Sequence, residues 1–338
     1  MNANKKPNGY HSTAFIAVFL ALPLLAERPS VVLDSGAAHL TIDLLGGGIV
    51  GFELTDLPLN PFTWEQKGGE QEARPRGHFL CLDRWGAPSD AEKANGMPFH
   101  GEASKVVWKV AKQSALEVEM SAELPMAKLR IVRRVRMEPG AAVAEVSETV
   151  SNLNPLGRIY NWVQHPSIAP PFLDESTILS SNAGVGFPQS DPGSEMRWPW
   201  ASKNDMRVDV SRLGGDPDPN VVSFVVDSDE GWVTAANPAK NLLVGYLWRT
   251  GDYPWLNIWR HSENGKPAAR GLEFGTTGLH QPFPVLVKKG TMLGRPLYAF
   301  LDAGESQTRG YWMFLTRVPQ GFSGASSVTR RGNKISVR

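Results

Sequence analysis

Residues 40–54, LTIDLLGGGIVGFEL, contain two apolar runs separated by three consecutive glycines. Apolar runs bounded by glycine predict a strand, a tight turn and a second strand. Gly46, Gly48 and Gly51 also fit the GxGxxG spacing of a dinucleotide-binding loop. That loop has to open a helix, whereas here the strand-like run GFEL leads into a turn bounded by proline. We therefore expect a β-hairpin in this part of the chain.

The same strand pattern continues along the rest of the chain. In residues 141–152, AAVAEVSETVSN, apolar and polar residues alternate, which places Ala144, Val146 and Val150 on one face of a strand. Similar runs are VVSFVV, GWVTAAN, NLLVGYLW and LYAFLDAG, and the 26 Pro and 33 Gly residues are scattered between such runs. Many short strands separated by turn signals predict an all-β fold, a sandwich or a barrel. No repeat or shift in composition marks a boundary, so we expect residues 27–338 to form a single domain.

The N-terminus has the pattern of an export signal. Lys5 and Lys6 precede an apolar run over residues 14–26, which is short for a membrane span and suits the apolar region of a signal peptide. Cleavage after Ala26 would remove it, although Leu24 stands where a small residue is preferred. Residues 1–26 are therefore expected to be a signal peptide or, alternatively, an uncleaved membrane anchor. Either way we expect an exported protein, periplasmic or extracellular.

Composition excludes several classes of function. Charged residues make up 20% of the chain and the net charge is +1, without the basic excess of a nucleic-acid-binding protein. The single cysteine, Cys81, cannot form an intramolecular disulfide, and its apolar context HFLCLDRW predicts a buried side chain. The sequence has no CxxC or HExxH pattern, so no metal site is predicted. The 11 tryptophans include candidates for platforms that pack against sugar rings.

Three titratable residues in ordered-looking contexts are the candidates for chemistry. They are His100 in PFHGEASKVVW, His165 in NWVQHPSIAPPF and Glu273 in RGLEFGTTG. An imidazole can give and take a proton at neutral pH, and a carboxylate is a suitable partner. Glu273 lies in an apolar run, where a buried carboxylate needs a partner. A structural ion pair with Arg270 therefore remains an alternative to a catalytic base.

The order of several motifs resembles that of the galactose mutarotase-like, or aldose 1-epimerase, superfamily. These motifs are LGGGIVGFEL, LNPFTW, PFHGEASKVVWKV, QHP and GLEFGT, and the resemblance covers about residues 40 to 315. It implies a large antiparallel β-sandwich, sometimes called a supersandwich, which agrees with the strand pattern. It also implies an enzyme that interconverts sugar anomers and needs no cofactor.

The resemblance assigns roles to individual residues. His100, followed by Gly101 and later by Trp108, matches the histidine that contacts the sugar. His165 takes the place of the general acid toward the ring oxygen, and Glu273 that of the base for the anomeric hydroxyl. Arg84 in LDRWG is the candidate for binding a sugar hydroxyl, with Arg76 second. The sequence departs from the pattern after His165, where Pro-Ser-Ile follows, and the substrate-binding aspartate has only Asp174 and Asp252 as candidates.

Opening a hemiacetal ring requires a base at the anomeric hydroxyl and an acid at the ring oxygen. We expect His165 and Glu273 to face each other across a cleft, with about 5–8 Å between their reacting atoms. Trp259 is a candidate sugar platform, although Tyr253, Trp255 and Trp259 together also have the pattern of core residues.

The remaining histidines are expected to be less important. His78, His261 and His280 are interpreted as ordinary core or surface residues, and His261 could border a cleft. Two alternatives to an epimerase of free sugars or oligosaccharides stay open. One is a non-catalytic carbohydrate-binding protein on the same fold. The other, less favoured, is a polysaccharide hydrolase or lyase, because hydrolysis normally uses two carboxylates that flank the bond.

Overall fold

A computed structural model describes residues 1–2 and 27–338 of the chain. The predicted signal peptide or anchor therefore lies almost entirely outside the described residues. Within the described part, no helix has the length and apolar character needed to cross a membrane. The prediction of an all-β fold is confirmed, because two large sheets make up most of the structure.

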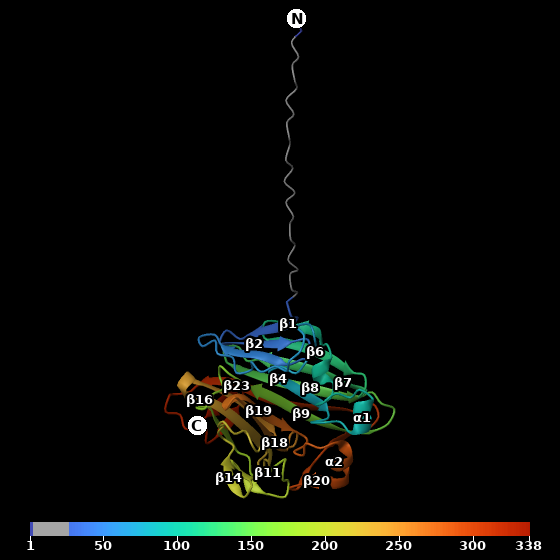
Figure 1. The fold of residues 1–338 in the computed structure, drawn as a ribbon, viewed down its shortest axis with the longest axis vertical. Helices are drawn as coiled ribbons and strands as arrows, with labels where there is room; N and C mark the ends of the chain where they lie inside the picture. The colour runs from blue at the N-terminus through green and yellow to red at the C-terminus, as the bar shows by residue number, and fades with distance from the viewer. Residues whose placement is uncertain (3–26) are drawn as a thin grey trace.

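The large sheet has 11 strands and carries the candidate site. Figure 1 shows it running from β1 and β2 at the top, through β4, β9 and β19, to β18 and β11 at the bottom. Its strands in spatial order are β1 (Ser30–Asp34), β2 (Ala38–Asp43), β3 (Ile49–Leu54), β4 (His78–Asp83), β9 (Arg158–Ile168), β19 (Lys266–Gly275), β18 (Trp255–Glu263), β15 (Val221–Val225), β11 (Val185–Pro188) and β12 (Met196–Arg197). A further strand, β22 (Ala299–Leu301), pairs with β9.

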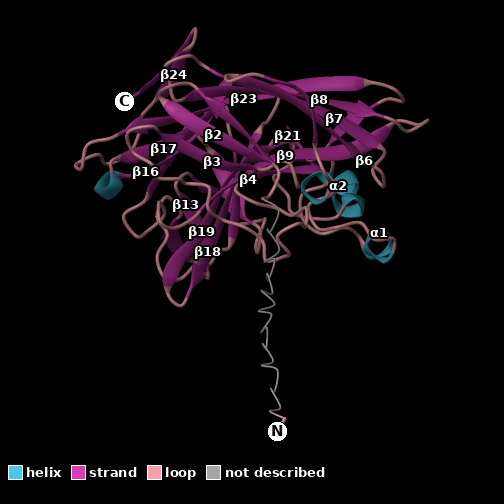
Figure 2. Ribbon diagram, turned by 90° about the horizontal axis from the view of Figure 1, so that it is seen from above, coloured by secondary structure: helices cyan, strands magenta, loops and turns pink. Residues whose placement is uncertain are grey.

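The second sheet has eight strands and packs against the large sheet, as Figure 2 shows from above. Its strands in spatial order are β10 (Ile178–Ser181), β16 (Glu230–Asn237), β17 (Leu242–Arg249), β23 (Ser306–Arg317), β8 (Val143–Asn152), β7 (Leu129–Met137), β6 (Glu117–Leu124) and β5 (Lys109–Gln113). The strand pairs within both sheets are antiparallel. The fold is therefore a large antiparallel β-sandwich.

The remaining elements are short and lie in the connections. Three two-stranded hairpins are β13 (Trp200–Lys203) with β14 (Met206–Asp209), β20 (Thr291–Met292) with β21 (Arg295–Pro296), and β24 (Val328–Arg331) with β25 (Lys334–Val337). The helical elements are α1 (Asp90–Ala94), α2 (Phe283–Lys289) and the 3₁₀ turns η1 (Ala103–Lys105) and η2 (Pro238–Lys240).

The core between the sheets follows from the alternation in the sequence. In β8 every second side chain from Ala144 to Asn152 is buried, as the pattern predicts. Ala144, Val146 and Val150 join a large apolar cluster that includes side chains from both sheets. Glu148 occupies the same buried face, where its carboxylate forms an ion pair with Arg133 of β7 at 2.6 Å. Burying a carboxylate requires such a partner.

The glycine-rich stretch forms the predicted hairpin between β2 and β3. Gly46 and Gly47 have φ angles of +114° and +67°, which favour glycine. A Cβ atom on Gly47 would lie 2.4 Å from the indole of Trp108, so this turn packs closely on the core. A strand follows the glycines, as expected, and not the helix that a dinucleotide-binding loop would open.

The register of the central strands fixes which side chains meet. On β4 and β9, Phe79 lies directly opposite His165. On β9 and β19, Gln164 pairs with Phe274, which places Glu273 opposite His165. Directly opposite residues on neighbouring strands have their Cβ atoms about 4.5–5.5 Å apart. The ladder itself therefore brings the side chains of Phe79, His165 and Glu273 together on one face of the large sheet.

Candidate functional site

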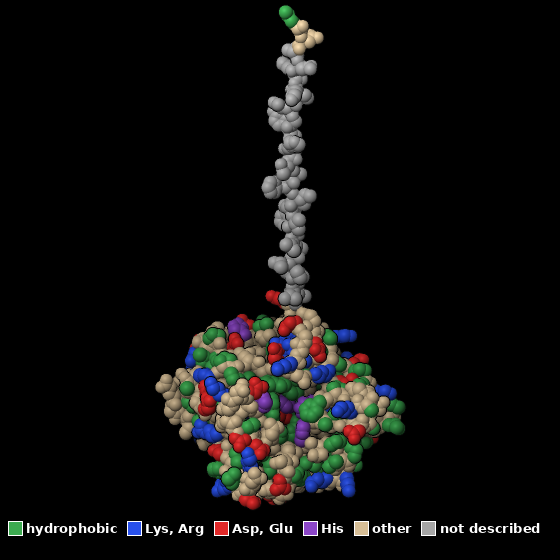
Figure 3. Space-filling view, viewed as in Figure 1, with side chains coloured by type: hydrophobic (Ala, Val, Ile, Leu, Met, Phe, Trp, Pro, Cys, Tyr) green, Lys and Arg blue, Asp and Glu red, His purple; other side chains and the backbone are tan. Residues whose placement is uncertain are grey.

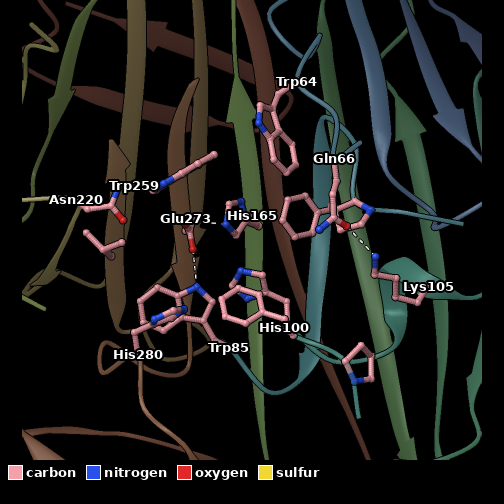
Figure 4. A pocket seen from close by; sticks show the side chains of 15 residues that line it. Trp64, Gln66, Trp85, His100, Lys105, His165, Asn220, Trp259, Glu273 and His280 are labelled. Atoms are coloured by element: carbon pink, nitrogen blue, oxygen red, sulfur yellow. Dashed lines mark hydrogen bonds and ion pairs between the residues drawn. The ribbon is translucent and has the colours of Figure 1, made fainter. Parts of the chain in front are cut away.

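A pocket of about 440 Å³ lies over the centre of the large sheet. Figure 3 shows histidine side chains gathered near the middle of this face, and Figure 4 shows the pocket from close by. The lining is mostly aromatic and apolar, with a few polar groups. Its residues are Trp64, Gln66, Pro75, Phe79, Trp85, Pro98, Phe99, His100, Lys105, His165, Asn220, Val221, Trp259, Glu273 and His280.

The structure brings four of the five predicted site residues into this one pocket. His100, His165, Trp259 and Glu273 all line it, although they come from distant parts of the chain. His165 and Glu273 are buried in its floor, with side-chain exposures of 6% and 2%. Trp259 lies on β18, two residues beyond Asn257, which is the cross-strand partner of Glu273.

The carboxylate of Glu273 contacts two partners. Glu273 Oε1 lies 3.1 Å from His165 Nε2, and the indole Nε1 of Trp85 donates to Oε2 at 2.6 Å. The expected separation of about 5–8 Å is therefore wrong, because the strand register makes His165 and Glu273 direct cross-strand neighbours. The alternative partner, Arg270, donates instead to the carbonyl of Val210, and Glu273 pairs with His165.

Burial determines the protonation of this pair. Loss of solvent raises the pKa of Glu273 to about 8, although the Trp85 hydrogen bond acts in the opposite direction. Burial also lowers the pKa of His165 to about 3. At neutral pH the carboxyl group of Glu273 is therefore protonated and the ring of His165 is neutral, so the pair has no net charge. The other ring nitrogen, His165 Nδ1, lies 3.0 Å from the hydroxyl oxygen of Ser167, which holds the ring in place.

His100 is held in a strained backbone conformation. Its φ angle is +66°, in the left-handed region that non-glycine residues rarely adopt. Its Nδ1 accepts a hydrogen bond from the backbone N–H of Gly86 at 3.0 Å, so the neutral ring carries its proton on Nε2. Burial is the main cause that holds the pKa of His100 well below its usual value. His100 therefore offers a neutral N–H donor to the site.

The structure explains why a glycine, Gly101, follows His100. A Cβ atom on Gly101 would lie 2.1 Å from the carbonyl oxygen of Leu82, where an isolated parallel bridge joins the two segments. Trp108, the third residue of this motif, is buried in the large apolar core cluster and donates to the carbonyl of Ala103 at 2.9 Å. Gly101 and Trp108 thus support the loop that carries His100.

Aromatic rings form the walls of the pocket. Phe79 stacks on His165 with ring centroids 4.2 Å apart, and Trp64 stacks on Phe79 at 5.7 Å. Trp259 meets Trp64 edge-on at 5.5 Å. Of the three aromatic residues grouped in the sequence, Trp259 lines the pocket, whereas Tyr253 and Trp255 are buried in core clusters. Rings of this kind suit the C–H faces of a sugar.

Arg84 does not reach the pocket, contrary to its predicted role. Its guanidinium forms ion pairs with Asp83 and with Glu92 of α1, and lies over the ring of Phe283. The side chain is 5% exposed and committed to these partners. The reason is local, since Glu92 belongs to a capping box that opens α1 beside Arg84.

The second-choice residues also lie elsewhere. Arg76 pairs with Glu65 and Asp43, and Asp174 pairs with Lys240. Neither these residues nor Asp252 is among the side chains that line the pocket.

Sequence reasoning missed several lining residues, above all His280 and Trp85. His280 was expected to be ordinary, but it packs against Trp85 with ring centroids 4.6 Å apart and lies 5.8 Å from His100. Burial lowers its pKa to about 4. Both residues lie in connections, Trp85 shortly after β4 and His280 between β19 and α2. Histidine and aromatic residues in the connections between predicted strands are a signal that could have found them.

The other histidines and the cysteine behave as expected. His78 is buried in the core, where it contacts Gln164 Oε1 and the hydroxyl of Tyr246, each at 3.2 Å. His261 stacks on Trp259 at 5.6 Å and so borders the pocket without lining it. Cys81 is buried, and burial raises the pKa of its thiol. Among the described residues, no three His, Cys, Asp or Glu side chains are arranged to hold a metal ion.

Solved structures show what this fold is similar to. A galactose mutarotase related enzyme from Lactobacillus acidophilus superposes with a TM-score of 0.66 at 13% identity, over 86% of this chain and 98% of that one. A galactose mutarotase-like protein from Lactobacillus casei superposes with a TM-score of 0.62 at 16% identity, over 85% of this chain and 100% of that one. A candidate aldose 1-epimerase from Escherichia coli K12 superposes with a TM-score of 0.63 at 14% identity, over 86% of this chain and 99% of that one.

These comparisons establish the fold as that of the galactose mutarotase-like proteins, which the motif order predicts. No protein-family model matches the sequence, and no curated protein matches it.

Proposed function

We propose that this protein is an aldose 1-epimerase-like enzyme that interconverts sugar anomers by acid–base opening and closing of the ring. The observation that carries the proposal is the contact of 3.1 Å between His165 and Glu273 in the floor of an aromatic pocket. The substrate would be a sugar or the reducing end of an oligosaccharide.

The close spacing of the two groups suits a hemiacetal. The anomeric hydroxyl and the ring oxygen are attached to the same carbon, so a base and an acid that act on them have to lie close together. The pair holds one proton, and when His165 carries it, Glu273 is a carboxylate. This ionised form presents the base and the acid at the same time.

In the proposed reaction, the sugar displaces the direct contact between the two side chains. A Glu273 oxygen takes the proton of the anomeric hydroxyl, and the freed electron pair forms the C1 carbonyl. The C1–O5 bond breaks, and O5 takes the proton from His165 Nε2. Rotation about C1–C2 and reclosure by the reverse steps give the other anomer and restore both groups. His100 Nε2 donates to a hydroxyl, and Trp259 packs against the ring.

Anomer exchange measured by NMR on freshly dissolved aldoses tests the proposal. Glu273→Gln and His165→Asn should each lower the rate by about 10²- to 10⁴-fold while sugar binding persists. Glu263→Gln and His39→Asn are matched controls, because both side chains are exposed and lie outside the pocket. Unchanged exchange in both site variants contradicts the proposal.

Two observations favour a second candidate, a non-catalytic carbohydrate-binding protein. His165 and Glu273 already satisfy each other, and Arg84 does not reach the pocket. Binding of sugars without anomer exchange in the wild-type protein would identify this function. A hydrolase is less well supported, because Glu273 contributes the only carboxylate among the described residues that line the pocket.

We also propose that the protein is exported, on the strength of Lys5, Lys6 and the apolar run over residues 14–26.

A further inference from the structure

Lys105 is the pocket residue that the proposed reaction does not use. It ends η1, and its Nζ donates a hydrogen bond of 2.7 Å to Gln66 Oε1. In the described part of the chain it forms no ion pair with a carboxylate. The nearby carboxylate of Glu72 instead accepts the backbone N–H of Gly69 at 3.1 Å.

The charge of Lys105 is not balanced by the rest of the lining. Glu273 shares its proton with His165, and burial lowers the pKa values of His100 and His280, so these groups are neutral near pH 7. Burial also lowers the pKa of Lys105, and Arg74 acts in the same direction while Glu72 opposes it. An anion beside Nζ would stabilise the ammonium form.

The loop that carries Lys105 is firmly anchored. The backbone N–H of Lys105 donates to the carbonyl of Glu102 at 2.7 Å, and Trp108 donates to the carbonyl of Ala103. The Glu102 carboxylate accepts the N–H groups of Met126 and Ala127. The backbone at Lys105 is therefore held in place, whereas its side chain reaches the solvent-exposed rim of the pocket.

The position of Lys105 relative to the acid–base pair defines a second contact point. Figure 4 shows Lys105 and Gln66 on one side of the pocket and Glu273 and Trp85 on the other, with His165 between them. A ligand whose anomeric centre lies over Glu273 and His165 can extend toward Lys105, because all three residues line the same pocket.

We infer that the substrate of this pocket is an acidic sugar whose carboxylate binds Lys105 and Gln66, as in a hexuronic acid. This inference rests on the proposed function for the placement of the anomeric carbon. A uronic acid carries its carboxylate on C5, on the other side of the ring oxygen from the anomeric carbon. The ammonium of Lys105 and the side-chain amide of Gln66 can both donate to it. One cation matches the single charge of a carboxylate, whereas a phosphate group carries more.

Titration calorimetry with D-glucuronate, D-glucose and D-glucose 6-phosphate tests the inference on the full chain. We expect D-glucuronate to bind more tightly than D-glucose. Lys105→Met should weaken glucuronate binding about 10-fold, because a hydrogen bond to a charged group is lost, and should weaken glucose binding much less. Lys105→Arg should retain most of the preference. The control Lys109→Met removes the same charge from the exposed strand β5, and should not change binding of either sugar.

The outcomes separate this inference from the proposed function. Equal affinity of the wild type for glucuronate and glucose, or no effect of Lys105→Met, overturns the inference while anomer exchange can still occur. No binding of glucuronate also overturns it. A preference for the 6-phosphate that depends on Lys105 replaces the carboxylate with a phosphate and overturns the stated class. Binding of glucuronate that depends on Lys105, without anomer exchange, supports the inference and contradicts the proposed enzyme.

Discussion

The indole Nε1 of Trp85 donates a hydrogen bond of 2.6 Å to Glu273 Oε2, although the two residues are 188 positions apart in the sequence. This bond favours the charged carboxylate and so lowers the pKa of Glu273, against the larger effect of burial. The contact joins the segment after β4 to the C-terminal part of β19. Through this hydrogen bond, Trp85 affects the pKa of Glu273 from a distant part of the sequence.

Trp85→Phe should raise the pKa of Glu273 further, by about one unit, because the carboxylate loses its hydrogen-bond donor and stays buried. Carbon-13 NMR of the labelled Glu273 carboxyl group over a pH series measures this without relying on activity. Trp200→Phe, on the β13 hairpin away from the pocket, is the control. A pKa unchanged from the wild-type value would show that the indole has no electrostatic role.

Glu273 should make the folded state less stable as the pH rises. Its pKa is about 8 when folded, against an ordinary value of 4.5. Below about pH 4.5 the carboxyl is protonated in both states, and between that pH and about 8 only the unfolded chain loses the proton. Relative to the wild type, Glu273→Gln should therefore be more stable at pH 8 than at pH 4.5, by up to about 4 kcal/mol. Urea unfolding at the two pH values measures the difference, and a constant difference would contradict the assigned shift.

Gly101→Ala should destabilise the fold by about 2–4 kcal/mol, because the new Cβ would lie 2.1 Å from the carbonyl oxygen of Leu82. Gly140→Ala is a matched control. Gly140 has a similar positive φ of +68°, but a Cβ there has open space around it, so only the backbone cost of about 1 kcal/mol applies. Chemical denaturation of both variants measures the free energies of unfolding. Equal losses of stability in the two variants would contradict the close contact between Gly101 and the carbonyl oxygen of Leu82.

Glu148→Gln should cost about 3–5 kcal/mol of stability, because it leaves the buried guanidinium of Arg133 without its ion-pair partner. The same two strands carry an exposed pair, Arg136 and Glu145, whose atoms lie 2.7 Å apart. Glu145→Gln should cost less than about 1 kcal/mol, since exposed pairs contribute little. Thermal or urea unfolding compares the two, and similar costs would contradict the effect of burial.

Residues up to about Ala26 should be absent from the mature protein, because a short apolar run follows Lys5 and Lys6. N-terminal sequencing of the protein isolated from its native host checks this. Retention of Met1 on a protein in the cytoplasm would contradict the proposed export, and retention of Met1 in the membrane fraction would identify an anchor.

Periodicity and turn chemistry were sufficient to predict the β2–β3 hairpin and the buried face of β8, because both depend on residues that are close in the chain. The spacing between His165 and Glu273 could not be predicted, since it depends on the register of β9 against β19. The sugar-binding role predicted for Arg84 was wrong, because its partner Glu92 lies on a helical turn that the sequence pattern did not reveal. His280 and Trp85 lie in connections, where no periodic pattern exists.

His165 and Glu273 project from adjacent strands in the middle of a sheet, whereas Trp64, Lys105 and His280 reach the pocket from connections between strands. His165 and Glu273 are thus part of the central sheet, whereas much of the surrounding wall comes from the connections between strands. Loops tolerate insertion and replacement far better than central strands do. Grafting different connections onto this sheet should therefore retarget the pocket to other ligands without changing the distance between the side chains of His165 and Glu273.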